Sequence, residues 1–153
     1  MTKTNLSAML LIVSLVSAAA KDFPPPGLTG TWTGQVEIFG PFKVEPYPSQ
    51  APEDHPQVII TIHSDGTVQG RIGAAKFVDA FVRKNRGWFF RLLNIKTDYI
   101  ITGGTLEGKV TPRDTGTKAE FLIPFSIVDD KLQGSINLLP KTPLTRQLNL
   151  VKK

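Results

Sequence analysis

The chain has 153 residues, of which 41% are hydrophobic and 20% are charged, and its formal net charge is +5. It contains no cysteine. Disulfides, thiol catalysis and thiolate metal sites are therefore excluded, and one hydrophobic core must hold the fold.

The first twenty residues have the pattern of a secretory signal peptide. Lys3 supplies a basic start, residues 6–16 are apolar apart from two serines, and Ala18 to Ala20 supply a small-residue cleavage site. A membrane anchor is the alternative, but the apolar run is shorter than the ~20 residues that a helical span needs. We expect export to the periplasm or the extracellular space of a bacterium.

Three segments follow from this pattern. Residues 1–20 are the signal peptide and residues 21–29, with three consecutive prolines, are a proline-rich linker, since prolines enforce extended structure. Residues 30–153 are a single β-barrel domain. No later stretch is apolar and long enough to resemble a membrane-spanning helix.

Short alternating strands fill most of this domain. Residues 31–39 place Trp32, Val36 and Ile38 on one face, and residues 57–63 and 67–72 form a hairpin around Asp65-Gly66. Residues 76–82 suit either a helix or a strand, and a strand is favoured. A long strand over 118–127 contains Pro124, which predicts a sheet edge or a bulge at that position.

The segment Arg83–Tyr99 does not have the alternation of a strand. Residues 87–94 predict one short helix of about two turns. The fold class is all-β, an antiparallel up-and-down β-barrel of about eight strands with this helix as the exception. An outer-membrane barrel is the competitor, but several strands are shorter than the ~9–11 residues that spanning requires.

Two tripeptides resemble a known family. Gly30-Thr31-Trp32 resembles the Gly-x-Trp that opens the first strand of lipocalins and related calycin barrels, and Thr97-Asp98-Tyr99 resembles their Thr-Asp-Tyr. The resemblance implies that the Trp closes one end of the barrel with a later Arg across it, a role open to Arg113 or Arg146. It also implies a small apolar ligand inside the barrel. The chain departs from lipocalins because four or five strands, and no helix, follow Thr-Asp-Tyr.

A small hydrophobic or amphipathic ligand is therefore the first functional hypothesis. The candidate ligand-binding residues are Trp32, Val36, Ile38, Phe77, Phe81 and Tyr99. The apolar strand positions also allow a barrel filled by its own side chains, and the pattern does not decide between the two.

An envelope interaction module is the second hypothesis. Residues 71–96 hold seven Lys or Arg and one acid, Asp79, a local charge of +6. Such a window favours anionic lipid or another anionic envelope component. The candidate contacts are Arg83, Lys84, Arg86, Trp88, Phe89 and Arg91. Trp88 and Phe89 also suit a plug at the barrel end.

Catalytic and metal-binding patterns are sparse. The two histidines, His55 and His63, have no metal-ligand spacing, and His63-Ser64-Asp65 are too close in sequence to form a catalytic triad. Asp79 suits a salt bridge better than acid–base catalysis. We expect no cofactor, no metal and no nucleic-acid partner, and the sequence gives little support for an enzyme.

Overall fold

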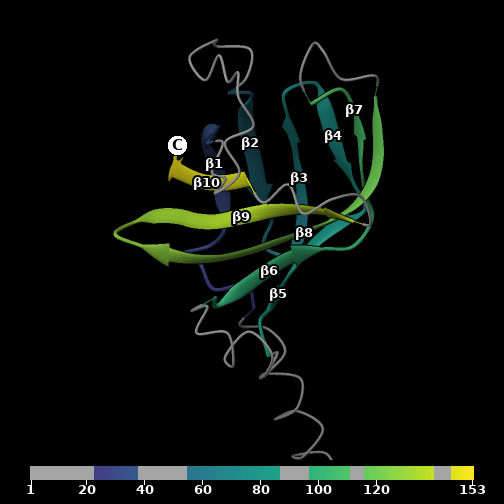
Figure 1. The fold of residues 1–153 in the computed structure, drawn as a ribbon. Helices are drawn as coiled ribbons and strands as arrows, with labels where there is room; N and C mark the ends of the chain where they lie inside the picture. The colour runs from purple at the N-terminus through teal and green to yellow at the C-terminus, as the bar shows by residue number, and fades with distance from the viewer. Residues whose placement is uncertain (1–22, 38–54, 87–96, 111–115, 140–145) are drawn as a thin grey trace, which may run out of the picture.

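The computed structural model describes residues 23–37, 55–86, 97–110, 116–139 and 146–153. Ten strands form one antiparallel sheet (Figure 1). Their bounds are β1 (Gly30–Glu37), β2 (Gln57–Ile62), β3 (Thr67–Ile72), β4 (Ala75–Val78), β5 (Ala80–Lys84), β6 (Tyr99–Thr102), β7 (Thr105–Gly108), β8 (Thr117–Val128), β9 (Lys131–Leu139) and β10 (Arg146–Lys152).

The sheet closes on itself. Its order runs β2-β1-β10-β9-β8-β6-β5-β3, and a β2–β3 pairing joins the two ends into a ring of eight strands. β4 and β5 lie end to end, and so do β6 and β7. The register in which β4 pairs with β7 is the same as the register in which β5 pairs with β6. The predicted up-and-down barrel is therefore confirmed. The helix predicted over 87–94 lies outside the described residues.

A bulge separates β4 from β5. Arg71 pairs with Lys76 and Val68 with Ala80, so three steps along β3 match four steps along β4 and β5. Asp79 lies at this place with φ 55. A short polar residue tolerates this left-handed conformation better than most residues do, so Asp79 has a structural role in the barrel wall.

The bulge reverses the alternation of the strand. Phe77 points inward, and simple alternation would place Phe81 inward as well. After the bulge, Ala80 and Val82 are buried and Phe81 is 44% exposed on the outer face. A Cβ at Gly103, between β6 and β7, would lie 2.6 Å from Phe81 Cδ1, so glycine at this position leaves room for the ring.

The prediction for Pro124 was wrong. Pro124 lies in β8 between β6 and β9, not at an edge, and the β8–β9 register is the same on both sides of it. Without a bulge, Phe121, Ile123 and Phe125 share the inward face, and Leu122 turns outward. Barrel closure supplies neighbours on both sides, which sequence patterns along a single strand do not reveal.

The described side chains fill the barrel interior. Those with no exposed surface come from strands all around the ring and include Val36, Val58, Ile60, Ala75, Ile101, Leu106, Ile123, Leu132, Leu148 and Leu150. A ligand-sized cavity between them would leave exposed surface on its walls, so this part of the interior is close-packed. Among the described residues, no helix has the length and apolar character to cross a membrane.

Candidate functional site: the capped end of the barrel

Residues 23–29 lie against one end of the barrel, which we name the capped end. Here β1 and β6 begin, and β2, β5 and β10 end. We name residues 23–29 the cap. The segment expected as a linker thus contributes to the core: Leu28 is 1% exposed, Pro24 is buried, and Phe23 packs against the core cluster.

The cap is folded by short-range contacts. Leu28 N donates to Pro25 O at 2.9 Å, and Thr29 Oγ1 donates to Pro26 O at 3.0 Å. These bonds close a turn that presents the Leu28 side chain to the barrel. The prolines limit the conformations that the segment must give up on folding, which favours this compact turn.

Two strand residues hold the cap in place. Trp32 Nε1 donates to Leu28 O at 2.9 Å, and Lys152 Nζ donates to Gly27 O at 3.2 Å. Trp32 pairs with Lys152 across β1 and β10, and Lys152 Nζ lies 5.5 Å from the centre of the Trp32 ring. Trp32 therefore satisfies its indole N–H while its ring, 1% exposed, closes the barrel.

An aromatic series continues across the same end. The ring centres of Phe23 and Tyr99 are 6.3 Å apart, and those of Tyr99 and Phe125 are 5.5 Å apart. Lys84 Nζ lies 5.8 Å from the centre of the Phe23 ring. The capped end therefore combines aromatic rings with two lysines, and neither lysine has a carboxylate partner among the described residues.

The chain leaves and re-enters the barrel at this end around residues 87–96. Asn85 N donates to Asp98 O at 2.9 Å and Asn85 Nδ2 donates to Thr97 O at 3.0 Å. Asp98 N donates to Ser126 Oγ at 3.1 Å. These bonds hold the end of β5 and the start of β6 together beside Tyr99. Thr97 and Asp98 therefore have a structural role here.

The predicted ligand-binding residues do not form one site. Trp32 and Tyr99 lie at the capped end, Val36 and Phe77 lie in the filled interior, and Phe81 lies on the outer face. Ile38 lies outside the described residues. The expectation for Phe81 was wrong because no local pattern predicts the bulge at Asp79.

The predicted anionic-partner residues are partly described. Arg83, Lys84 and Arg86 are exposed at the capped end, and Trp88, Phe89 and Arg91 lie outside the described residues. The +6 window does not form a single patch, since Arg71 and Lys76 lie at the other end of the barrel. Lys152, which sequence reasoning missed, faces Trp32 only because β10 closes the ring against β1.

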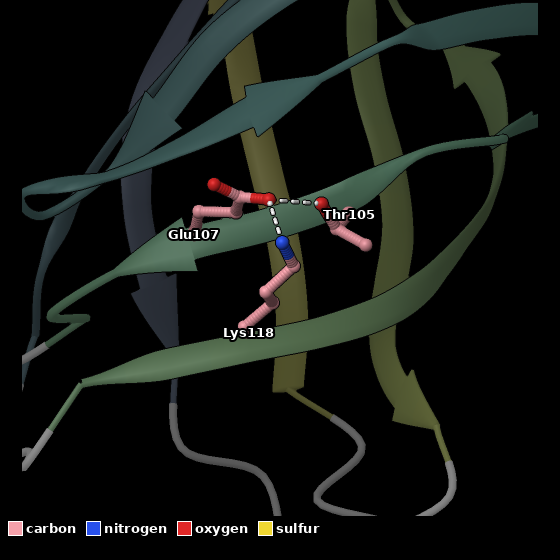
Figure 2. A network of polar contacts seen from close by, with 3 residues as sticks. All are labelled: Thr105, Glu107 and Lys118. Carbon is pink, nitrogen blue, oxygen red and sulfur yellow. Dashed lines mark hydrogen bonds and ion pairs between the residues drawn. The ribbon is translucent and has the colours of Figure 1, made fainter.

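The other end of the barrel, which we name the turn end, carries a polar network on its outer face. Glu107 Oε1 accepts a hydrogen bond from Thr105 Oγ1 at 2.8 Å and lies 3.2 Å from Lys118 Nζ (Figure 2). The Thr105 hydrogen bond first, and then Lys118, lower the pKa of Glu107 below its ordinary value. In the backbone register of β4 and β7, Lys76 is the residue opposite Glu107.

The sequence His63-Ser64-Asp65, which contains the residue types of a catalytic triad, lies in the hairpin turn between β2 and β3. Asp65 Oδ1 accepts from Thr67 Oγ1 at 2.6 Å and from Thr67 N at 2.9 Å, and these bonds lower the pKa of Asp65. His63 Nε2 is buried without a hydrogen-bond partner in the described structure. Among all the residues that the structure describes, no group of three or more His, Cys, Asp or Glu side chains could hold a metal ion.

The arginine expected over Trp32 is not Arg146. The backbone of Arg146 starts β10 at the turn end, and Lys152 lies over Trp32 instead. Arg113 lies outside the described residues. Both tripeptides, Gly30–Trp32 and Thr97–Tyr99, are nevertheless at the capped end. No family model matches the chain, and no curated protein and no solved structure is similar enough to count as a match.

Proposed function

We propose that this chain is an exported β-barrel whose capped end docks on an anionic membrane surface. The observation that carries the proposal is the arrangement at this end: Arg83, Lys84 and Arg86 are exposed together, beside the point where residues 1–22 join the cap. Basic side chains near an anionic membrane surface each contribute about 1 kcal/mol of attraction.

The position of Phe23, the first described residue, supports the orientation. A signal peptide occupies the membrane during export, and only two residues separate the expected cleavage position after Ala20 from Phe23. The cap therefore lies next to the lipid surface when export ends. The exposed arginines of the same end then face the head groups.

The bases of the two ends differ in their partners within the described residues, and the capped end also carries four exposed acids, Asp65, Asp98, Asp129 and Asp130. Lys118 is paired with Glu107, and Arg71 Nη1 donates to Gly73 O at 3.0 Å. At the capped end Asp65 is held by Thr67. Asp129 and Asp130 are at the tip of the β8–β9 hairpin, which extends past the start of β6 to the left of Figure 1.

Vesicle flotation tests the proposal. The protein without residues 1–20 should float with phosphatidylglycerol vesicles and not with phosphatidylcholine vesicles, and 0.5 M salt should release it, because the screening length falls from about 10 Å at 0.1 M salt toward about 3 Å at 1 M. Arg83→Glu with Arg86→Glu should weaken binding at least about tenfold. The matched variant Lys76→Glu with Lys109→Glu changes the net charge equally at the turn end and should bind as the unmodified protein does. Equal losses in both variants, or no flotation at low salt, would reject the proposal.

A calycin-like barrel that holds a small hydrophobic ligand is the second candidate. The shared position of the two tripeptides supports the resemblance. The filled interior leaves such a ligand the ends of the barrel, and near the turn end Phe77 and Phe121 pack with ring centres 4.8 Å apart, with Leu138 opposite Phe121 in the β8–β9 register. Mass spectrometry of organic extracts of the purified protein tests this candidate, and a clean extract with no uptake of apolar dyes would count against it.

A further inference from the structure

The outer face of β10, β1 and β2, three neighbouring strands of the barrel wall, is uncharged over three successive outward positions of each strand (Figure 1). The outward residues are Gln147, Asn149 and Val151 on β10, Thr31, Thr33 and Gln35 on β1, and Gln57, Ile59 and Thr61 on β2. The residues that alternate with them, such as Leu150, Val36 and Ile60, are buried in the core. This face therefore offers hydrogen bonds and apolar contact, but no charge, to a partner.

Three exposed amide side chains form a row across these strands, which we name the amide row. Asn149 lies opposite Gln35 in the register of β10 and β1, and Gln35 lies opposite Gln57 in the register of β1 and β2. Neighbouring strands are about 4.8 Å apart, so the row spans about 10 Å. None of the three side chains hydrogen-bonds to another residue in the part of the chain that the structure describes. Each amide therefore keeps its N–H donors and its carbonyl acceptor for a partner.

A second row, which we name the apolar row, runs beside the amide row on the same strands. Val151 lies opposite Thr33, and Thr33 lies opposite Ile59. Val151 is 48% exposed and is one of four large apolar side chains that are exposed among the described residues. Successive outward positions of a strand are about 7 Å apart. The two rows together make a patch of about 10 Å by 7 Å, with amides along one side and methyl groups along the other.

We propose that this patch binds a neutral oligosaccharide in an extended conformation, laid across the three strands. A sugar hydroxyl both donates and accepts hydrogen bonds, and a side-chain amide offers both in return. The C–H faces of the sugar rings pack on the methyl groups of the apolar row, which removes apolar surface from water. The spacing of neighbouring amides is close to the length of one sugar in a β-1,4-linked chain, so each amide meets one sugar.

The charges around the patch favour a neutral glycan over an anionic one. Charged residues continue the apolar row only on the flanking strands, Lys131 opposite Val151 on β9 and Arg71 opposite Ile59 on β3. A protein partner fits less well than a short glycan, because a stable protein–protein interface buries about 800 Å² on each side. The size of the patch matches two or three sugars.

The glycan site does not depend on docking of the capped end on a membrane. Docking uses the positive charge of Arg83 and Arg86, whereas the patch lies on the barrel wall and uses uncharged groups. Salt should therefore release the protein from vesicles and leave glycan binding unchanged.

An NMR titration with cellotetraose tests the site in protein that lacks residues 1–20. The side-chain amide resonances of Asn149, Gln35 and Gln57 should shift, with a Kd on the order of 1 mM because the groups are few and exposed, and 0.5 M salt should not change this value. Gln35→Ala with Asn149→Ala should lower the affinity about tenfold. Gln69→Ala removes an exposed amide of β3 outside the amide row and should bind as the unmodified protein does. No shift at millimolar cellotetraose, or shifts that disappear in 0.5 M salt, would overturn the proposal.

Two further controls test the apolar row and the shape of the glycan. Val151→Ser should weaken binding about threefold, and Val128→Ser, at a valine of β8 that is 43% exposed outside the patch, should not. Maltotetraose has the same sugars in a bent chain and should bind more weakly than cellotetraose, so equal affinities would contradict an extended ligand across the strands. Arg83→Glu with Arg86→Glu should leave cellotetraose binding unchanged, even where it abolishes flotation, and a loss of both would reject a separate glycan site.

Discussion

The capped end and the turn end close the same barrel by different physical means. At the capped end, buried side chains meet a segment that is not a strand: Leu28 lies against the barrel and Trp32 donates to its carbonyl. At the turn end, the tight turn between β3 and β4 bonds to neighbouring strands, Gly73 N to Gln57 O at 2.8 Å and Ala74 N to Lys109 O at 3.0 Å, beside the packed rings of Phe77 and Phe121. A docked segment that is not a strand therefore closes one end, and a turn bonded to its neighbours closes the other.

Among the substitutions that test this difference between the two ends, Trp32→Ala should cause the largest loss in the free energy of unfolding. It removes a fully buried ring and leaves the Leu28 carbonyl without its donor. Large-to-small changes of this kind cost about 3–5 kcal/mol. Urea unfolding followed by circular dichroism would measure the loss. Phe81→Ala, which removes a ring from the outer face, is the control and should cost less than about 1 kcal/mol. Similar losses in both variants would contradict the central place of the capped end.

Leu28→Ala tests the cap itself. Loss of a buried leucine costs about 2–3 kcal/mol if the cap stays in place, and less if the cap detaches and the barrel remains folded. Limited proteolysis separates these outcomes, since a detached cap is cut near Pro25 before the barrel is. Leu139→Ala, at a leucine that is 46% exposed near the turn end, should change stability by no more than about 0.5 kcal/mol. A cap as resistant to proteolysis in Leu28→Ala as in the unmodified protein would argue that Leu28 does not hold it.

Much of the barrel wall could be predicted from the sequence because its information is local. Alternation identified the faces of Trp32 and Val36, and Asp65-Gly66 identified the β2–β3 hairpin. The errors arose where long-range pairing decides the outcome. The bulge at Asp79 turned Phe81 outward, and closure of the ring gave Pro124 a neighbour on each side.

The candidate site was harder to predict for the same reason. Its parts lie far apart in the chain, from Phe23 to Lys152, and they meet only once β1 pairs with β10. Three consecutive prolines indicate an extended segment, but they give no sign that Leu28 is buried. The nearest available signal was the leucine itself, an apolar residue directly after the prolines and before the first strand.

A smaller and stabilising effect is expected at the tip of the β8–β9 hairpin. Asp129 and Asp130 have φ 50 and φ 58, so both central residues of this turn are left-handed and two like charges are adjacent. Glycine adopts such a conformation without the steric cost, which is about 1 kcal/mol for other residues. Asp130→Gly should therefore raise the free energy of unfolding by up to about 1 kcal/mol, measured by thermal unfolding. Asp130→Ala keeps the charge change but not the backbone freedom, and an equal gain in that variant would assign the effect to charge alone.

The smallest effect is expected at the turn end, in the pH dependence of Glu107. Its pKa is lowered from 4.5, mainly by the Thr105 hydroxyl and then by Lys118. A carboxylate with a lowered folded-state pKa contributes stability above its unfolded pKa, and this contribution is lost as the pH falls through the folded value. Thr105→Val should move the pKa of Glu107 back toward 4.5, as followed by carbon NMR of the side-chain carboxyl, with little change in stability at pH 7 because the pair is exposed. Asp65, held by Thr67 in the turn beside the capped end, is the internal reference and should titrate as before. An unchanged Glu107 titration in Thr105→Val, together with a shift in Lys118→Met, would instead assign the lowered pKa to the ion pair. The pKa of Glu107 would then be set by the charge of Lys118, although the contacts of Glu107 indicate the Thr105 hydroxyl as the larger cause.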